Sequence, residues 1–190
     1  MWLVVGLGNP GRRYRDTRHN VGFVVVHHLA ERWGFPAVAR SQLGAEVGEG
    51  IVDGVEVVTC LPQSFMNRSG QPVHSLAGYY QVPPERVLVV HDDLDLGFGA
   101  LRCKQGGGHG GHNGLRDIIR LMGADFPRVR FGIGRPPEGV ETADHVLAPW
   151  LPDEAGALPP LVDRACEAAQ AVLTQGALAA MNRYNARAAP

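Results

Sequence analysis

Residues 4–22, VVGLGNPGRRYRDTRHNVG, constrain the fold more than any other stretch of this chain. A short apolar run at 2–5 predicts a buried strand, and residues 21–33 follow the pattern of an amphipathic helix. Open α/β sheets place their sites where a strand ends in a polar loop. His19 stands at the start of the helix among polar neighbours, where an imidazole can titrate near neutral pH. The alternative is that His19 only helps Asn20 to cap the helix.

Further apolar runs alternate with helical patterns along the chain. The expected strands are 45–52, 55–61, 87–90, 100–104 and 129–133, and the expected helices are 72–80, 115–122 and a C-terminal set after a proline-rich connection at 136–152. Asp53-Gly54 is a two-residue hairpin signal, so the first two of these strands should be antiparallel. The sequence predicts an α/β fold, a single globular domain over residues 1–190 with a mixed β-sheet surrounded by helices.

Composition favours a water-soluble protein in a reducing compartment. The net charge is −1, no apolar run is as long as a membrane span, and no basic leader precedes residues 2–5, so we expect a cytoplasmic protein without membrane contact. The three cysteines are far apart and predict buried strand or core residues. Residues 96–135 carry seven basic and two acidic side chains, whereas 136–190 carry three basic and seven acidic ones. Such asymmetry indicates a surface for a polyanion, or simply a mixed solvated surface.

The hexapeptide GLGNPG (6–11) satisfies the dinucleotide-binding pattern G-x-G-x-x-G after a strand. Three observations argue against a dinucleotide fold. Pro10 removes a backbone donor from the turn, residues 12–16 do not begin an amphipathic helix, and the next two strands form a hairpin where that fold requires a crossover.

Histidine and three carboxylates follow the run at 87–90, in the sequence HDDLD (91–95). The carboxylates could hold Mg²⁺. The favoured alternative is that one of them orients a histidine and raises its basicity. Asp93 and Asp95 are then turn residues.

A loop of unusual glycine content, GGGHGGHNG (106–114), precedes a helix. Glycine at this density is tolerated where a ligand or backbone must approach closely. His109 and His112 are possible metal ligands, but a flexible tether without a third ligand makes a poor zinc site. Asn113 is either a helix cap or, together with the loop amides, faces an RNA or a carbonyl oxygen.

Residues 62–70, PQSFMNRSG, follow the second hairpin strand. Phe65 and Met66 are core residues by default; if exposed, Phe65 offers a stacking face and Asn67 a fixed amide. No serine or cysteine has a basic partner nearby in sequence. One histidine, one strand-end aspartate and three amides (Asn9, Asn67 and Asn113) suit hydrolysis by an activated water better than a covalent route.

Six motifs, taken in order, resemble bacterial peptidyl-tRNA hydrolase. They are GLGNPG (6–11), Y-x-x-TRHN-x-G (14–22), P-x-x-FMN-x-SG (62–70), HDDLDL-x-x-G (91–99), K-x-GGGHGGHNGL (104–115) and R-x-GIGRP (130–136). Each is weak alone, but six in order over residues 3–136 are specific, and no motif position has lost a functional side chain.

The resemblance implies an enzyme that cleaves the ester between a peptide and the 3′-terminal ribose of tRNA. It implies that His19 is the catalytic base, that Asp92 stabilises its basic form, and that Asn9 tells N-blocked from free aminoacyl-tRNA. Tyr14, Phe65, Asn67 and Asn113 fall on tRNA or substrate contacts, and Lys104 and Arg130 on positions that contact tRNA phosphate.

The resemblance also implies a monomer without metal or other cofactor. Its partner is peptidyl-tRNA, bound by acceptor stem and 3′ end, whether free or on stalled large ribosomal subunits. A non-catalytic RNA-binding module is the alternative, because the family has a plant organellar splicing relative with the same fold. Intact His19, Asp92 and Asn9 favour the enzyme.

Overall fold

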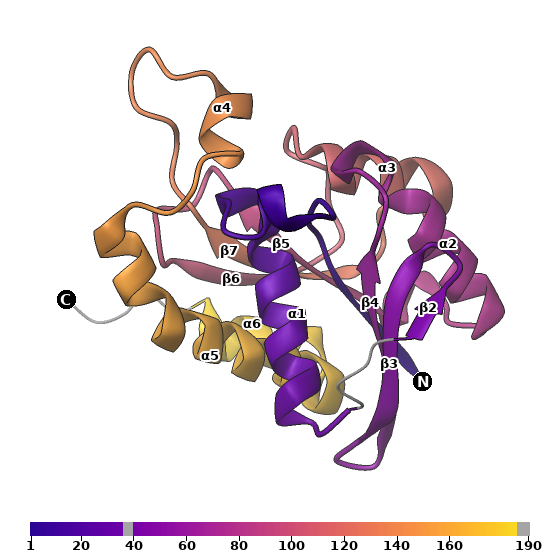
Figure 1. Ribbon diagram of the computed structural model, residues 1–190. Coiled ribbons are helices and arrows are strands. Elements are labelled where there is room, and N and C mark those ends of the chain that lie inside the picture. The colour runs from indigo at the N-terminus through magenta and orange to yellow at the C-terminus, as the bar shows by residue number, and fades with distance from the viewer. Residues whose placement is uncertain (36–39, 186–190) are drawn as a thin grey trace.

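A computed structural model describes residues 1–35 and 40–185, and within these ranges seven strands form one sheet in the order β2-β3-β4-β1-β5-β7-β6 (Figure 1). The strands are β1 (Trp2–Gly6), β2 (Arg40–Gln42), β3 (Ala45–Val52), β4 (Val55–Pro62), β5 (Val87–Asp93), β6 (Leu101–Gln105) and β7 (Pro127–Gly132). The α-helices are α1 (Val21–Arg32), α2 (Gly70–Tyr79), α3 (Asn113–Met122), α4 (Thr142–Val146), α5 (Pro152–Gln175) and α6 (Ala177–Tyr184). Short 3₁₀ turns are η1 (Arg12–Tyr14), η2 (Arg18–Asn20), η3 (Met66–Arg68) and η4 (Pro84–Arg86). No helix in the described ranges is long and apolar enough to cross a membrane.

The sheet is mixed, as expected, and its centre is parallel. β4, β1, β5 and β7 run in the same direction, while β2 and β3 at one side and β6 at the other pair antiparallel to their neighbours. The carboxyl ends of four strands therefore share one edge, where the polar segments after β1 and β5 meet. The hairpin forms through Asp53 (φ 48°) and Gly54 (φ 80°), so the chain takes no dinucleotide-type crossover at this point.

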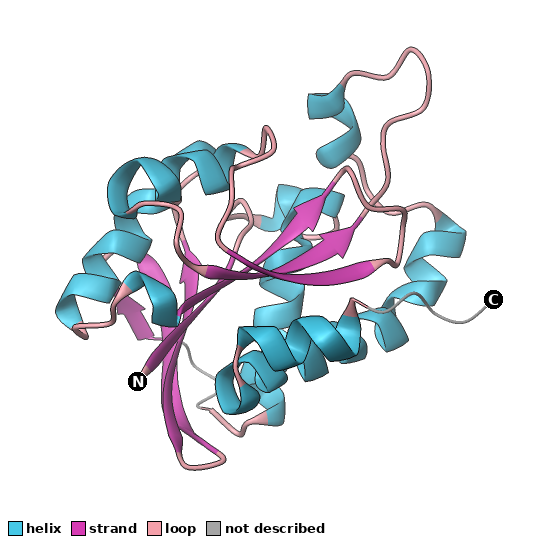
Figure 2. Cartoon of the chain, turned by 180° about the vertical axis from the view of Figure 1, so that it is seen from behind, coloured by secondary structure: helices cyan, strands magenta, loops and turns pink. Residues whose placement is uncertain are grey.

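Helices cover both faces of the sheet (Figure 2). On one face α1, α5 and α6 pack on a core that contains Val4, Leu88 and Val90. On the other face α2 and α3 pack on a core that contains Leu3 and Val89. Alternate residues of one strand enter opposite cores, because successive side chains in a strand point to opposite faces.

Several elements differ from the sequence-based expectation, which did not include the short strand β2 and began β7 two residues later. β5 continues to Asp93, beyond the apolar run at 87–90, because β7 pairs with residues 89–93. The connection at 136–152 contains helix α4. α2 begins at Gly70, two residues before the proline expected to start it.

Two glycines allow the loop that carries His19 to lie against the sheet. A Cβ on Gly22 would lie 2.6 Å from the backbone nitrogen of Leu7 and 2.7 Å from its oxygen. A Cβ on Gly6 would lie 2.8 Å from the carbonyl carbon of Gly22. The first turn of α1 therefore touches the backbone of the sheet, and this contact fixes η2 immediately before it.

Cys60, Cys103 and Cys166 are buried and free, as their sequence context predicts. Burial raises the pKa of the Cys103 and Cys166 thiols to about 11 and raises that of Cys60 further. These thiols stay protonated at neutral pH, so none is an activated nucleophile.

Candidate active site

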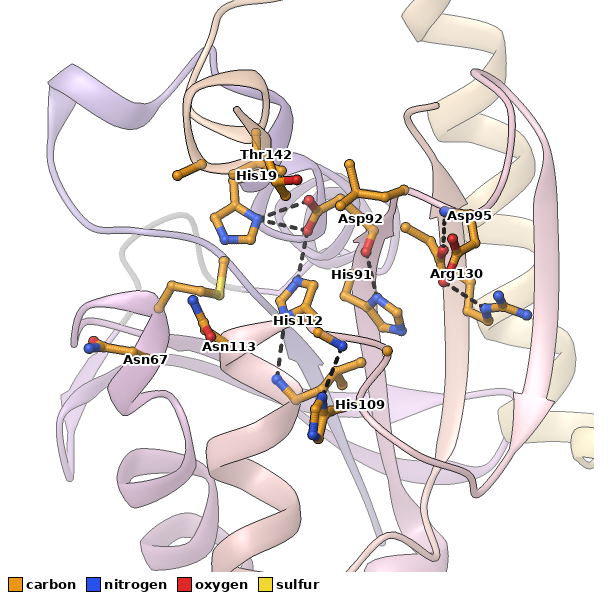
Figure 3. A pocket seen from close by; sticks show the side chains of 18 of the residues that line it. His19, Asn67, His91, Asp92, Asp95, His109, His112, Asn113, Arg130 and Thr142 are labelled. Carbon is orange, nitrogen blue, oxygen red and sulfur yellow. Dashed lines mark hydrogen bonds and ion pairs between the residues drawn. The ribbon is translucent and has the colours of Figure 1, made fainter. Parts of the chain in front are cut away.

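A cavity of about 750 Å³ opens at the carboxyl edge of the parallel strands (Figure 3). Its walls come from segments far apart in the sequence: the loop after β1, the turn after β4, the end of β5, the glycine loop before α3, and α4. All nine site residues expected from the sequence line it, namely Asn9, Tyr14, His19, Phe65, Asn67, Asp92, Lys104, Asn113 and Arg130. The fold thus brings the separate motifs together in one place.

His19 and Asp92 are directly paired, although 73 positions separate them. His19 Nδ1 lies 2.9 Å from Asp92 Oδ2 and 3.0 Å from Oδ1. The exposed fraction of the side chain is 11% for His19 and 2% for Asp92. A proton on Nδ1 is needed for this bond to an ionised carboxylate, so His19 Nε2 carries the free lone pair. The imidazole therefore bonds Asp92 and does not help to cap α1, which was the alternative for His19.

His112 is a second partner of Asp92 that sequence reasoning missed. Its Nδ1 accepts hydrogen bonds from the backbone N–H groups of Gly114 (3.1 Å) and Leu115 (3.3 Å), which makes it the N-cap of α3. An accepting Nδ1 carries no proton, so the proton is on Nε2, which donates to Asp92 Oδ1 at 2.8 Å. The available signal is a histidine directly before the helix start. The cap was one of the two alternatives for Asn113, which is instead the first residue of α3.

Asp92 and His19 shift each other's pKa, and His112 contributes to the shift of Asp92. Burial alone would lower the pKa of His19, but the charge and hydrogen bond of Asp92 outweigh it and raise the pKa above the ordinary 6.5. Burial acts to raise the pKa of Asp92, yet His19 and His112 hold it well below the usual range. Asp92 is therefore ionised at neutral pH.

His91 is a buried neutral neighbour of this cluster. Its Nδ1 donates to the backbone oxygen of Asp92 at 2.7 Å, and its ring meets His112 edge-on with centroids 5.2 Å apart. Burial, with a smaller contribution from His112, lowers the pKa of His91 to about 3. Its imidazole therefore packs as an uncharged ring beneath His112.

The cluster has the composition of a metal site but not its chemistry. Potential ligand atoms of His19, Asp92 and His112 lie within 4.8 Å of one another. A metal on His112 Nε2 would force its proton onto Nδ1, against the amides of Gly114 and Leu115. The donor set therefore does not fit a metal ion.

The carboxylates of the HDDLD motif do not form a Mg²⁺ site. Asp92 faces the two histidines, Asp93 Oδ2 accepts from Arg130 Nε at 2.8 Å, and Asp95 pairs with Arg135. Each carboxylate has different partners, so the three do not converge on one point.

Asn9 is held by both its backbone and its side chain. Its backbone N–H and C=O bond the amide side chain of Asn20, each at 2.9 Å, and its Oδ1 accepts from the backbone N–H of Met66 at 2.8 Å. Since Oδ1 is engaged, Nδ2 is the atom left to donate to a ligand. Within residues 1–35 and 40–185, Asn9 Nδ2 makes no hydrogen bond to a protein acceptor.

The remaining amides and rings lie nearer the mouth of the cavity. Phe65 is 61% exposed, so the default interpretation as a core residue is wrong and the stacking face is available. Asn67 is exposed, and its amide points away from His19 (Figure 3). Asn113 is the first residue of α3, and its Oδ1 accepts from Arg116, which leaves Nδ2 as a donor. Tyr14 is half-buried at the end of η1.

The basic strand face expected from β7 has two different roles. Arg130 is one-quarter exposed and paired with Asp93. Arg128 is buried, and its guanidinium donates to the backbone oxygens of Gly107 (2.6 Å) and Gly108, which holds the glycine loop. Gly107 (φ 108°) leaves room for Lys104, since a Cβ there would lie 2.7 Å from Lys104 Cε.

Comparison with known proteins gives a consistent result. A family model described as "Peptidyl-tRNA hydrolase" matches residues 3–190. The chain is 50% identical to the peptidyl-tRNA hydrolase of Chloroflexus aurantiacus over 190 residues, covering 97% of this chain and 99% of the relative. It is also 50% identical to that of Nocardia farcinica, over 96% of this chain and 95% of the relative. The crystal structure of the peptidyl-tRNA hydrolase from Acinetobacter baumannii superposes with a TM-score of 0.87 at 42% identity, covering 98% of this chain and 95% of that one.

Proposed function

The chain belongs to the peptidyl-tRNA hydrolase family and is a carboxylic-ester hydrolase that acts on peptidyl-tRNA; on this premise we propose that His19 is the general base and Asp92 its supporting carboxylate. The observation that carries the assignment is the bond from His19 Nδ1 to Asp92. It leaves Nε2 as a proton acceptor in a cavity lined by amide donors.

The proposed reaction needs no covalent intermediate. His19 Nε2 takes a proton from water as the water oxygen attacks the ester carbonyl carbon. The imidazolium is stabilised by Asp92 and then gives its proton to the ribose oxygen as the carbon–oxygen bond breaks. The products are the free peptide acid and tRNA with its terminal hydroxyl restored. The chain's own residues supply each proton transfer, so we propose that no metal or other cofactor takes part.

Side-chain amides are suited to the carbonyl end of the substrate. The Nδ2 groups of Asn9 and Asn113 are donors whose partner Oδ1 atoms are already engaged, so their orientation is fixed. Preorganised donors of this kind stabilise the charge that develops on the carbonyl oxygen in the transition state. Asn67, at the mouth with its amide turned from His19, suits a contact to the tRNA end of the substrate.

Exposed rings and cations are suited to the tRNA. We assign Phe65 and Tyr14 to stacking or hydrogen bonding with the 3′ end, and Lys104 and Arg130 to acceptor-stem phosphates. Phosphate contacts carry no sequence information, so one enzyme can accept different tRNAs. We further propose a monomer in the cytoplasm that acts on peptidyl-tRNA, free or on stalled large ribosomal subunits.

The assignment is tested by turnover of N-acetyl-aminoacyl-tRNA with purified wild-type and His19→Ala proteins. The variant should bind tRNA as the wild type does and hydrolyse it hardly at all. Unchanged turnover in His19→Ala would remove His19 from the mechanism. Chelation by EDTA should not alter the rate on a short acceptor-stem substrate, which does not depend on Mg²⁺ for folding.

Arg130→Ala should weaken substrate binding more than Lys104→Ala does. Both remove one positive charge, but the first also leaves the Asp93 carboxylate unpaired next to the proposed phosphate site. KM should rise with kcat little changed, because phosphate contacts are alike in ground and transition states. The salt dependence of binding should decrease by about one in slope for each variant. Arg86→Ala, at an exposed arginine in η4, is the control, and a collapse of kcat in Arg130→Ala at unchanged KM would contradict the role.

Asn9→Asp should reduce selectivity for N-blocked substrates. The Asp side chain can still accept from the Met66 amide, but it replaces the donor Nδ2 by a charged acceptor. A free α-amino group is cationic and is attracted to that charge, whereas a blocked amide loses its donor. The ratio of kcat/KM for N-acetyl-aminoacyl-tRNA and aminoacyl-tRNA should fall by about tenfold or more, as expected for one hydrogen bond to a charged group. If the ratio keeps its wild-type value, Asn9 is only a structural turn residue.

A further inference from the structure

One wall of the cavity belongs to a segment that leaves the body of the protein. Residues 136–151, here called the arm, lie between β7 and α5 and carry α4 (Figure 1). Thr142, Ala143 and Val146 of the arm line the cavity. The position of the arm therefore decides the shape of the site on the side of α4.

The arm is held by the residue directly before His19. Arg18 has a side chain that is 5% exposed, and its Nη1 donates to the backbone oxygen of His145 at 3.3 Å. Its backbone N–H donates to the oxygen of Ala148 at 3.1 Å. Its guanidinium carbon lies 5.9 Å from the ring centroid of Trp150.

Glu154 completes this contact from the first turn of α5. Its Oε1 accepts from Arg18 Nη2 at 2.7 Å and from the backbone N–H of Leu151 at 2.9 Å. One carboxylate oxygen thus accepts hydrogen bonds from both the guanidinium and the last residue of the arm. In the described part of the chain Arg18 Nε has no hydrogen-bond partner, so the fork of the two Nη atoms makes the side-chain bonds.

We propose that Arg18 is a positioning residue that, through Glu154, holds the arm and the His19 loop as one rigid unit. The guanidinium bonds both the end of α4 and the start of α5, and the backbone of Arg18 leads directly into His19. Movement of the arm would therefore move the base relative to Asp92, which stays on β5. The inference rests on the proposed role of His19.

Lysine cannot replace Arg18 in this role. Its single nitrogen would have to reach Glu154 and the His145 oxygen at once, which the planar fork of arginine does with two different atoms. The cation at position 18 must also keep its carboxylate partner, because a buried cation without a partner is strongly unfavourable. We therefore expect the hydrogen-bond geometry, beyond the charge alone, to matter.

The experiment compares Glu154→Ala, Glu154→Gln and Arg18→Lys with Gln170→Ala as control. Gln170 bonds Trp33 and Asp53 at a place that does not line the cavity, so its loss perturbs stability alone. All measurements are made at a temperature where circular dichroism shows each variant fully folded. Backbone amide exchange is followed at two positions. The Arg18 N–H donates to the oxygen of Ala148 in the arm, and the Ala148 N–H donates to the oxygen of His145, which also accepts from Arg18 Nη1.

Glu154→Ala and Arg18→Lys should lower kcat/KM by about 10–100-fold, the size expected when a reacting group is misplaced by about an ångström. KM should rise and kcat fall together, and both amides should exchange faster than in the wild type. Glu154→Gln, whose amide oxygen can still accept both hydrogen bonds, should keep most of the activity. Its two amides should exchange as slowly as in the wild type. The control should change neither.

The proposal is overturned if exchange at both amides and kcat/KM in Glu154→Ala match those of Gln170→Ala. Its failure differs from failure of the proposed function. Should His19→Ala keep full activity, the role of His19 is wrong, while the exchange data still report whether Arg18 and Glu154 hold the arm.

Discussion

Replacing Asp92 by asparagine should lower kcat by about 10²–10⁴-fold, the usual contribution of a general acid–base pair. The amide nearly preserves the shape of the carboxylate but removes the charge that supports the developing imidazolium on His19. It can also offer a donor to His19 Nδ1 and so stabilise the tautomer with its proton on Nε2, which cannot accept a proton from water. Steady-state turnover of N-acetyl-aminoacyl-tRNA measures the loss.

The pair should also behave as one unit. His19→Ala with Asp92→Asn should be scarcely slower than His19→Ala alone, because effects of residues that act together are not additive. If the two losses multiply in a double mutant that is still folded, Asp92 does not act through His19, and the histidine needs another partner.

The pH profile gives an independent measurement of the same contact. The base works only when neutral, so activity falls as the pH drops below the pKa of His19, which Asp92 raises above 6.5. Without the carboxylate charge, the lowering by burial remains. The acidic limb of the profile should therefore move to lower pH in Asp92→Asn, and a limb that stays in place would argue against the contact.

A matched variant separates the two imidazoles on Asp92. Asparagine is a good N-cap, so His112→Asn can still cap α3 while it removes the ring from Asp92. Since the His19–Asp92 bond is retained, kcat should fall much less than in Asp92→Asn. An equal fall would mean that His112 contributes to the chemistry as much as Asp92 does.

Gly22→Ala should destabilise the protein by about 3 kcal/mol or more, at the upper end of the cost of overpacking. The added Cβ would meet the backbone of Leu7, and backbone cannot move aside as a flexible side chain can. Such a loss is a large share of the 5–15 kcal/mol that a domain of this kind typically has. Urea unfolding gives the free energy of unfolding directly.

Gly78→Ala is the control for this prediction. Gly78 lies in α2 with open space around the place of a Cβ, so alanine should leave stability unchanged or raise it by about 0.5–1 kcal/mol. If Gly22→Ala is as stable as Gly78→Ala, the first turn of α1 is not held by close contact with the sheet.

Local patterns in the sequence predict most of the elements here. Apolar runs and the Asp53-Gly54 turn gave the strands and the hairpin, because a buried face and a turn signal act over a few residues. The end of β5 could not be found that way. Asp92 and Asp93 are poor strand formers, and they are extended because β7 pairs with them, with Asp92 opposite Phe131.

The candidate site shows the same limit. Residue types and the family resemblance identified His19 and Asp92, but the contact between them depends on how the loop after β1 meets β5. His112 was missed because its function depends on two contacts at once, with the amides of α3 and with Asp92. Helix α4 of the arm could not be predicted for a similar reason. It is only five residues long, lies between prolines, and is held by a contact with Arg18, which is distant in sequence.

The alternation of side chains along β5 has a consequence for the spacing of the two substrate groups that the site can bind together. Asp92 serves the histidine that we assign to the chemistry, and the next residue, Asp93, holds the arginine that we assign to phosphate. One peptide unit, about 3.3 Å of strand, joins the two, and it lies inside a sheet with neighbours on both sides. The strand therefore fixes the spacing between the two proposed contacts, and we expect an ester at another distance from the acceptor stem to satisfy only one of them.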